Sequence, residues 1–353
     1  MIKLLRKFLF PFAILYGFIT GIRNFLFDKG ILKSYSFEIP IIAVGNLSTG
    51  GTGKTPQIEY LIRLLSPKYK VATLSRGYKR QSKGFILADA RSNAEILGDE
   101  PFQFYSKFKD IQVAVATNRK KGIEKLLYQK TKSNGFESQN SNQIILLDDA
   151  FQHRKVKAGF YILLTSYDDL YLDDWLLPTG NLRESRSGAH RANLIIVTKC
   201  PVNLSFDEQN TIKRLLLKNK VYKQELYFSY IDYDDFIFSE NQKIAISDIK
   251  NKKKLLLAGI AKPQPFFDYL KTDQDVCLTF PDHHFFTEHE MSSIQKQAAA
   301  DLIVTTEKDY VRLKGKLPQD QLYYLPIQSC FLNGQNNFDK TILDFVKNNI
   351  NKT

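Results

Sequence analysis

The stretch IIAVGNLSTGGTGKTP at residues 41–56 decides the predicted fold, because it reads as a strand, a glycine-rich loop and the start of a helix. Its first four residues are apolar and mostly β-branched, as is typical of a buried parallel strand. The glycines let the backbone turn its N–H groups toward an anion, and the following helix points its positive dipole end at the same place. The lysine adds a mobile positive charge, and the threonine hydroxyl after it can bind Mg²⁺. We therefore expect a triphosphate cradle made of Ser48, Thr49, Gly50, Gly51, Thr52, Gly53, Lys54 and Thr55.

This stretch departs from the phosphate-loop pattern G-x-x-x-x-G-K-[ST] at one position, since Ser48 stands where the first glycine is usual. Glycine-rich turns before helices also occur as plain structural turns. However, Gly53, Lys54 and Thr55 follow an apolar strand and precede apolar residues at helical spacing, at positions 58, 61, 62 and 65. This combination favours nucleotide binding over an ordinary turn.

The bulk composition is that of an ordinary globular protein. With 353 residues, 43% of them hydrophobic and 25% charged, the chain can form two domains and a sizeable core. The net charge of +13 favours an acidic partner, such as a nucleotide, a phosphorylated lipid, an anionic membrane or a nucleic acid. The basic residues are scattered and no helicase-like motif is apparent, so we expect no nucleic-acid partner. Three cysteines that are far apart and lack metal spacing predict free thiols in a reducing compartment.

The first residues predict a membrane-associated helix. Basic residues at positions 3, 6 and 7 precede an uncharged, mostly apolar stretch at 8–22, and Arg23 follows it. The stretch is shorter than the ~20 apolar residues that a spanning helix needs, and no small-residue cleavage site follows it. We expect a helix that lies in, or dips into, the cytoplasmic face of a membrane. The alternative is a helix packed on the protein's own core, and the sequence does not distinguish a spanning helix from an interfacial one.

Strands alternate with helices along most of the chain, which predicts a mostly parallel α/β sheet flanked by helices, like that of phosphate-loop NTPases. A second strand, glycine turn and helix begin at residue 254 and predict a smaller α/β domain. We expect a membrane helix region at 1–34, a phosphate-loop nucleotide-binding domain at 35–221, an extended β linker at 222–252 and the smaller domain at 253–353.

Acidic and basic residues follow several of these strands. The apolar strand at 144–148 ends in Asp148 and Asp149, and an acid at such a strand tip holds Mg²⁺ or its water shell in phosphate-loop sites. Arg76 lies in a basic loop after another strand, where open α/β sheets bind ligands, although a solvated turn is equally compatible. Asp99 and Glu100 enter a helix, where two acids could simply cap it.

Eight blocks of this sequence resemble one family, tetraacyldisaccharide 4′-kinase, an enzyme of lipid A assembly. They occur in order along nearly the whole chain, whereas a phosphate loop alone would be far less specific. The blocks are VGNLSTGGTGKTP (44–56), LSRGY (74–78), GDEP (98–101), LDDAFQHR (147–154), LPTGNLRE (177–184), AGIAKP (258–263), FPDHHF (280–285) and TEKD (306–309). The mild departures at Ala150, in the loop after Leu177 and in the block at Gly259 touch none of the expected phosphate, metal or base positions.

The resemblance implies transfer of the γ-phosphoryl group of ATP to the 4′-hydroxyl of a tetraacylated glucosamine disaccharide 1-phosphate, giving lipid IVA. It implies that the reaction uses Mg²⁺ and takes place at the cytoplasmic face of the inner membrane. Asp99 would be the catalytic base and His283, from the second domain, its partner. Beside these two residues, we expect Thr55, Asp148 and Asp149 as metal ligands, with Glu100 as a further candidate. The candidates for phosphate or substrate contacts are Arg76, Arg119 and Arg183.

Two other classes of protein remain as alternatives. A membrane ATPase switch can carry a similar glycine-rich loop, but such switches usually have a lysine early in the loop, where this chain has Ser48 and Thr49. They also need no acid to deprotonate a substrate. A nucleic-acid-binding ATPase is suggested only by the positive net charge. Dependence of ATP use on an acylated disaccharide, on a partner protein or on nucleic acid would separate the three.

Overall fold

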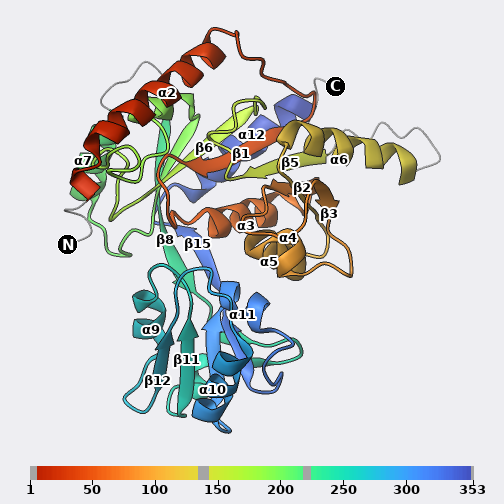
Figure 1. The fold of residues 1–353 in the computed structure, drawn as a ribbon, viewed down its shortest axis with the longest axis vertical. Helices are drawn as coiled ribbons and strands as arrows, with labels where there is room; N and C mark the ends of the chain where they lie inside the picture. The colour runs from red at the N-terminus through yellow and green to blue at the C-terminus, as the bar shows by residue number, and fades with distance from the viewer. Residues whose placement is uncertain (1–5, 134–142, 218–223, 351–353) are drawn as a thin grey trace.

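A computed structural model describes residues 6–133, 143–217 and 224–350, and this part of the chain forms two α/β units (Figure 1). The larger unit is built on a sheet in the order β15-β8-β7-β6-β1-β5-β2-β4-β3. The strands from β8 to β4 pair in parallel and the edge strands β15 and β3 pair antiparallel, which confirms the predicted fold class. These strands are β1 (Ile41–Asn46), β2 (Lys70–Ser75), β3 (Phe85–Leu87), β4 (Gln112–Ala116), β5 (Gln143–Asp148), β6 (Phe160–Ser166), β7 (Leu194–Thr198), β8 (Glu225–Tyr233) and β15 (Ile327–Phe331).

Helices cover both faces of the larger sheet, because its central strands carry apolar side chains on both sides. In β1, Ile42 and Val44 pack in one cluster with α3 (Lys54–Leu65) and α12 (Gln335–Ile350). The alternate residues Ile41 and Ala43 pack in another cluster with α6 (Arg119–Ser133). Every residue of β1 is buried, as expected of a strand between two helical layers. The remaining helices of this unit are α4 (Ala94–Leu97), α5 (Asp99–Lys107), α7 (Phe206–Leu216) and the 3-10 helix η1 (Arg186–Arg191).

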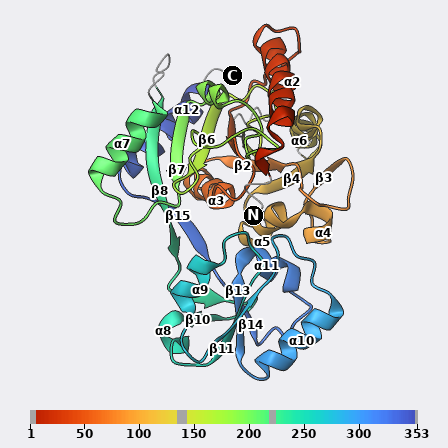
Figure 2. The ribbon, with the colours of Figure 1, turned by 60° about the vertical axis from the view of Figure 1, so that its left-hand side comes forward.

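The smaller unit has its own sheet, in the order β10-β9-β14-β13-β11-β12, and its own core (Figure 2). The strands are β9 (Phe236–Phe238), β10 (Lys243–Ala245), β11 (Lys254–Ala258), β12 (Val276–Thr279), β13 (Leu302–Thr306) and β14 (Leu322–Leu325). Its helices are α8 (Ile246–Ile249), α9 (Gln264–Leu270), α10 (Glu288–Ala298) and α11 (Glu307–Leu313). Helix α11 packs against α5 of the larger unit, so these two helices form the main contact between the units.

The chain crosses between the units twice, from β8 to β9 and back from β14 to β15. After the second crossing, α12 buries Phe338, Ile342 and Val346 against the larger sheet. The sequence placed residues 327–350 within the smaller domain of 253–353, whereas the structure packs them on the larger one. Helical periodicity shows that α12 has an apolar face but does not say which sheet that face covers. Strands β9 and β10, expected in a linker at 222–252, belong to the smaller sheet, and the expected boundary at 221/222 lies outside the described residues.

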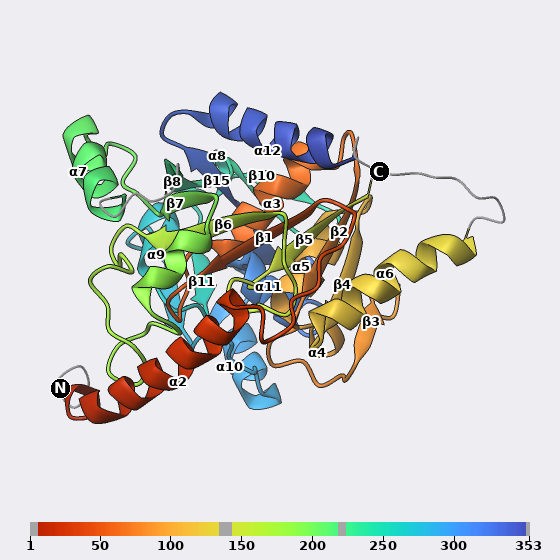
Figure 3. The same cartoon turned by 90° about the horizontal axis from the view of Figure 1, so that it is seen from above.

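Helix α2 (Phe10–Asp28) confirms the expected N-terminal helix and continues to Asp28, beyond the uncharged stretch (Figure 3). Within the described chain it is the one helix whose length and apolar composition would allow it to cross a membrane. It runs along the outside of the larger unit, and only Ala13 and Phe27 among its residues are buried. Its exposed large apolar side chains are Phe10, Phe12, Ile14, Leu15, Phe18, Ile19, Ile22 and Phe25. Helix α2 is therefore packed on the surface of the larger unit, while most of its apolar side chains remain exposed.

Candidate active site

The phosphate loop joins β1 to α3 and ends at Gly53, whose φ of 78° is a left-handed conformation that favours glycine. Helix α3 has no side-chain cap and no acid in its first turn, so its N-terminal N–H groups remain available to an anion. The end of β7 holds the loop. Thr198 Oγ1 donates to Thr52 O at 2.9 Å, and Lys199 Nζ donates to Gly51 O at 2.6 Å. The loop thus has the form of the predicted cradle.

The start of the loop is also tied down. Thr49 N donates to Asn181 O at 2.7 Å, and Ser48 forms an isolated β-bridge with Leu182. The loop at 177–184 therefore runs beside the phosphate loop. Sequence reasoning identified both loops but not that they pair, because pairing between segments so far apart in the chain leaves no local signal.

Lys54, the first residue of α3, points toward the strand tips. Its Nζ lies 3.4 Å from Asn46 Oδ1 and 3.7 Å from Asp149 Oδ1. Asp149 also receives two hydrogen bonds from Arg183, from Nη1 at 3.0 Å and from Nη2 at 2.8 Å. Burial alone would raise the pKa of Asp149, but Lys54 and Arg183 outweigh it and hold the pKa at about 2. Arg183 thus positions an acid of the site.

Asp148 has fewer partners than its neighbour. Ser75 Oγ donates to Asp148 Oδ2 at 3.2 Å, and the residue is 9% exposed. Burial, and then the charge of Asp149, raise the pKa of Asp148 to about 6. A buried carboxylate with so little compensation suits a cation, which would favour its ionised form.

The donor set fits Mg²⁺ in the way that phosphate-loop proteins bind it. Thr55 is the second residue of α3, and Asp148 and Asp149 end β5; Glu100 is close enough to Asp148 to raise its pKa. Among the described residues, no three or more His, Cys, Asp or Glu side chains form a group that could hold a metal ion. Mg²⁺ is usually held by one or two carboxylates together with substrate phosphates and water, so these residues need the nucleotide to complete the site.

Asp99 and His283 meet across the two units. Asp99 is the first residue of α5, and its Oδ2 lies 2.8 Å from His283 Nδ1. The preceding Gly98 has a φ of 90°, and a Cβ there would lie 3.1 Å from Tyr78 O, so the turn that presents Asp99 favours glycine. His283 itself has a φ of 59° in the loop that follows β12. The structure therefore brings together the two residues that the sequence named as base and partner.

Two cations of α11 surround this pair. Arg312 donates from Nε to Asp99 Oδ1 at 2.9 Å and from Nη2 to Asp99 Oδ2. Lys308 Nζ lies 2.9 Å from His283 Nε2 and 3.5 Å from Glu100 Oε1. The TEKD block at 306–309 contains Lys308 but predicts no role for it, and no motif predicts Arg312. Their spacing of four residues, which puts both side chains on one helix face, was the available signal.

The other predicted arginines occupy different places. Arg119 is 1% exposed and donates to Ala116 O at 2.7 Å and to Asp148 O at 3.1 Å. Burial lowers the pKa of Arg119 to about 10. Its guanidinium is used up in holding the backbone at the ends of β4 and β5. This position does not fit the expected contact with a phosphate or substrate. Arg76 is exposed at the end of β2 and remains available for such a contact.

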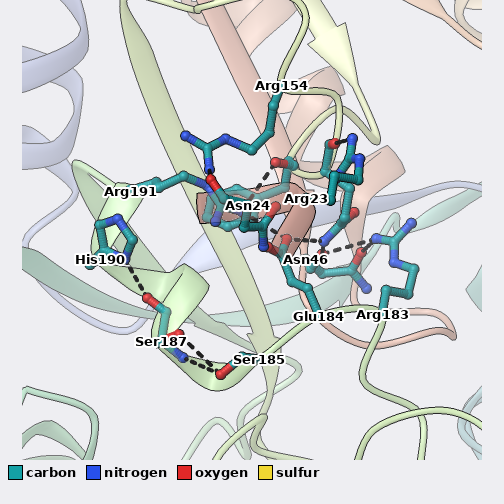
Figure 4. A network of polar contacts seen from close by, with 12 residues as sticks. Arg23, Asn24, Asn46, Arg154, Arg183, Glu184, Ser185, Ser187, His190 and Arg191 are labelled. Atoms are coloured by element: carbon teal, nitrogen blue, oxygen red, sulfur yellow. Dashed lines mark hydrogen bonds and ion pairs between the residues drawn. The ribbon is translucent and has the colours of Figure 1, made fainter. Parts of the chain in front are cut away.

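A polar network connects α2 to the loop that carries Arg183 (Figure 4). Its centre is Glu184, 2% exposed, which accepts hydrogen bonds from Asn24 at 2.8 Å, Gln152 at 2.9 Å and Arg191 at 2.7 Å. Tyr16 Oη donates to the carbonyl of Arg183 at 2.8 Å. The apolar helix is thus fixed beside the phosphate loop and its acids, a link that no local sequence pattern predicts.

Comparison with known proteins agrees with this site. A family model described as tetraacyldisaccharide-1-P 4′-kinase matches residues 5–347. A tetraacyldisaccharide 4′-kinase of Flavobacterium johnsoniae is 66% identical over 348 residues, covering 99% of each chain. One of Bacteroides thetaiotaomicron is 43% identical over 368 residues, covering 98% of this chain and 94% of the other. The crystal structure of LpxK from Aquifex aeolicus in complex with ATP superposes with a TM-score of 0.75 at 29% identity, covering 97% of this chain and 99% of that one. The chain belongs to the tetraacyldisaccharide-1-P 4′-kinase family, whose members are phosphotransferases that act on an alcohol group.

Proposed function

We propose that this protein transfers the γ-phosphoryl group of ATP to the 4′-hydroxyl of a tetraacylated glucosamine disaccharide 1-phosphate, giving lipid IVA. The observation that carries the proposal is the hydrogen bond of 2.8 Å between Asp99 and His283, in the unit contact beside the phosphate loop. The proposal is also supported by the names of the similar proteins and by the ATP in the similar crystal structure. A membrane ATPase switch would need no such acid.

In the proposed reaction, the sugar hydroxyl oxygen forms a bond to the γ-phosphorus while the bond from that phosphorus to the β–γ bridging oxygen breaks. ADP leaves with the electron pair of that bond, and the hydroxyl proton passes to Asp99. Lys54 and the N–H groups of the phosphate loop bind the phosphates and orient them for attack. Asp99 needs its charge for this role, and Arg312 favours that charge. Because half of the acid–base site lies on each unit, closure of the units on the substrate would expel water that would hydrolyse ATP.

The metal is proposed to be Mg²⁺, held by Thr55, Asp148 and Asp149 together with phosphate oxygens, with Glu100 as a further candidate. When bound, it would neutralise charge that develops on the phosphates during transfer. Glu100 Oε1 lies 3.5 Å from Lys308 Nζ. The metal would therefore compete with the Lys308 ammonium for the Glu100 carboxylate.

The membrane is proposed to meet the protein at α2, on the cytoplasmic side of the inner membrane. The exposed apolar residues of the helix provide the contact, and the exposed Lys7 and Lys29 that flank the helix suit anionic headgroups. A substrate with four acyl chains stays in the bilayer, since each buried CH₂ contributes about 0.8 kcal/mol. The network at Glu184 would keep the phosphate loop at a fixed position relative to that surface.

The test is transfer of label from γ-labelled ATP to a tetraacyl disaccharide 1-phosphate in detergent, with Asp99→Ala beside the wild type. We expect labelled lipid with the wild type and a loss of about 10²–10⁴-fold with the variant, the usual contribution of a positioned base. ATP hydrolysis by the wild type without labelled lipid would instead favour the membrane ATPase switch. Turnover of Asp99→Ala near that of the wild type would remove Asp99 from the role of base.

A further inference from the structure

Both ring nitrogens of His283 are engaged. Nδ1 lies 2.8 Å from Asp99 Oδ2, and Nε2 lies 2.9 Å from Lys308 Nζ. The Asp99 carboxylate belongs to the larger unit, and the Lys308 ammonium belongs to α11 of the smaller unit. The imidazole is thus held from two sides, and its side chain is only 15% exposed.

The chemistry of the two partners assigns the proton on the ring. A lysine ammonium has three donors and no acceptor, so Nε2 must be the acceptor in its contact with Lys308. An ionised carboxylate only accepts, so Nδ1 must carry the proton that points to Asp99. We propose that Lys308 is a positioning residue that holds His283 as a neutral donor to Asp99. This inference rests on the proposed function, because it assigns the parts of the same acid–base site.

Lys308 is itself fixed between carboxylates of both units. Its Nζ lies 3.0 Å from Asp282 Oδ1 and 3.5 Å from Glu100 Oε1, and its side chain is 20% exposed. These two acids keep the ammonium beside the ring, instead of leaving a long flexible side chain in solvent. The position of Lys308 is therefore specified by three neighbours, which an ordinary surface lysine does not have.

The remaining surroundings of His283 do not offer an alternative donor to Nε2. Arg312 Nη2 lies 3.1 Å from Nδ1, but it donates to the same Asp99 oxygen as the ring does. Asp282 Oδ1 is 3.9 Å from Nε2, beyond hydrogen-bond distance, and the ring of Tyr78 meets the imidazole edge-on with centroids 5.3 Å apart. Among the described neighbours, Lys308 is the donor that occupies Nε2.

This arrangement separates the roles of base and partner. His283 has no free lone pair with which to take the proton of a sugar hydroxyl, because Nδ1 bears a proton and Nε2 accepts from Lys308. Asp99 Oδ1 accepts a bond from Arg312 Nε, which leaves one of its lone pairs for the substrate. The proton of the hydroxyl therefore goes to Asp99, while His283 keeps the carboxylate oriented.

The first test reads the ring nitrogens directly. The protein, which has five histidines, is labelled with ¹⁵N-histidine, and the signals of His283 are assigned by their loss in His283→Gln. In the wild type we expect a proton on Nδ1 and a bare Nε2. Lys308→Met should lose the bare Nε2 signal, whereas Lys308→Arg should retain it, since a guanidinium also only donates. A wild-type ring protonated at Nε2, or a wild-type pattern in Lys308→Met, would overturn the proposal.

The second test is kinetic and uses the same variants. Lys308→Met should lower kcat about tenfold or more while the KM for ATP changes less than about twofold, and Lys308→Arg should recover most of kcat. Lys296→Met, at an exposed position of α10, is the matched loss of charge and should change neither value.

A large rise in the KM for ATP with an unchanged nitrogen pattern would make Lys308 a phosphate ligand and overturn the proposal. If the wild type does not phosphorylate the lipid at all, the proposed function fails, while the nitrogen signals still decide the role of Lys308.

Discussion

Asp99 and Arg312 form a two-point ion pair across the contact between the two units. Arg312 Nε donates to Oδ1 at 2.9 Å, and Nη2 donates to Oδ2. Burial alone would raise the pKa of Asp99, but the hydrogen bonds from Arg312 and His283 outweigh it and keep the pKa below its usual range. The pair therefore fixes the direction of the carboxylate and keeps it ionised, and it can form only while α5 and α11 lie together.

Replacing Arg312 should change how activity depends on pH. Asp99 can act as a base only when it is ionised, and loss of the guanidinium raises its pKa. In Arg312→Ala the acidic limb of the kcat profile should therefore move to higher pH, and kcat at neutral pH should fall because the carboxylate is less well held. Arg91→Ala, which removes an exposed arginine paired with Asp89, is the control. An acidic limb that stays in place in Arg312→Ala would contradict this assignment.

Lys107 should be important for stability, because it lies between two buried carboxylates. Its Nζ is 2.7 Å from Glu59 Oε2 on α3 and 2.6 Å from Glu307 Oε1 on α11. The side chains of these acids are 0% and 7% exposed, so Lys107→Met would leave Glu307 without its ion-pair partner and Glu59 with only Arg63 and Gln103. We expect a loss of about 3–5 kcal/mol in the free energy of unfolding, measured by denaturant titration. Lys120→Met removes a comparable pair with Glu124 on the surface and should change stability little.

Glu307 should make part of the stability depend on pH. Burial, and then the charge of Glu59, raise the pKa of Glu307 in the folded protein. Because the unfolded chain has the lower pKa, the stabilising contribution is complete below that value and is lost as pH rises through the raised pKa. Glu307→Gln cannot ionise, so its unfolding free energy should decline less between acidic and mildly alkaline pH than that of the wild type. Parallel pH curves for the two proteins would exclude this role.

The apolar face of α2 should carry membrane binding. Phe18 and Ile19 are 66% and 57% exposed, so replacing both with Glu should leave the fold intact while it removes apolar contact and adds repulsion from anionic lipid. We expect the double variant to be lost from the vesicle fraction in flotation with anionic liposomes. Val202→Glu, at another exposed apolar position, serves as the control and should float like the wild type. Flotation of the double variant at the wild-type level would show that α2 is not the anchor.

Much of the architecture could be predicted because its signals are local. The apolar run of β1, the glycines after it and the helical spacing after Lys54 each depend on neighbours along the chain. The same is true of the acids that end β5 and of the uncharged N-terminal helix. Short-range backbone and side-chain preferences are sufficient for these elements, so sequence reasoning found them in their correct places.

The contacts between distant segments could not be predicted in the same way. Arg312 has no motif of its own, and it becomes part of the site only because α11 packs on α5. Arg119 was expected at a ligand, but it begins α6, is 1% exposed and donates to the carbonyls of Ala116 and Asp148 at the ends of β4 and β5. The packing of α12 on the larger sheet depends on a chain that crosses back at β15, for which helical periodicity gives no information.

The sequence by itself thus determined the phosphate loop, the metal-binding acids that we propose, the sheet class and the apolar helix, since each follows from residues close together in the chain. Only the tertiary structure decided that Asp99, His283, Lys308 and Arg312 form one cluster between two units. The physical reason is that hydrogen bonds and ion pairs depend on distances of about 3 Å, which packing of distant elements sets and local sequence does not.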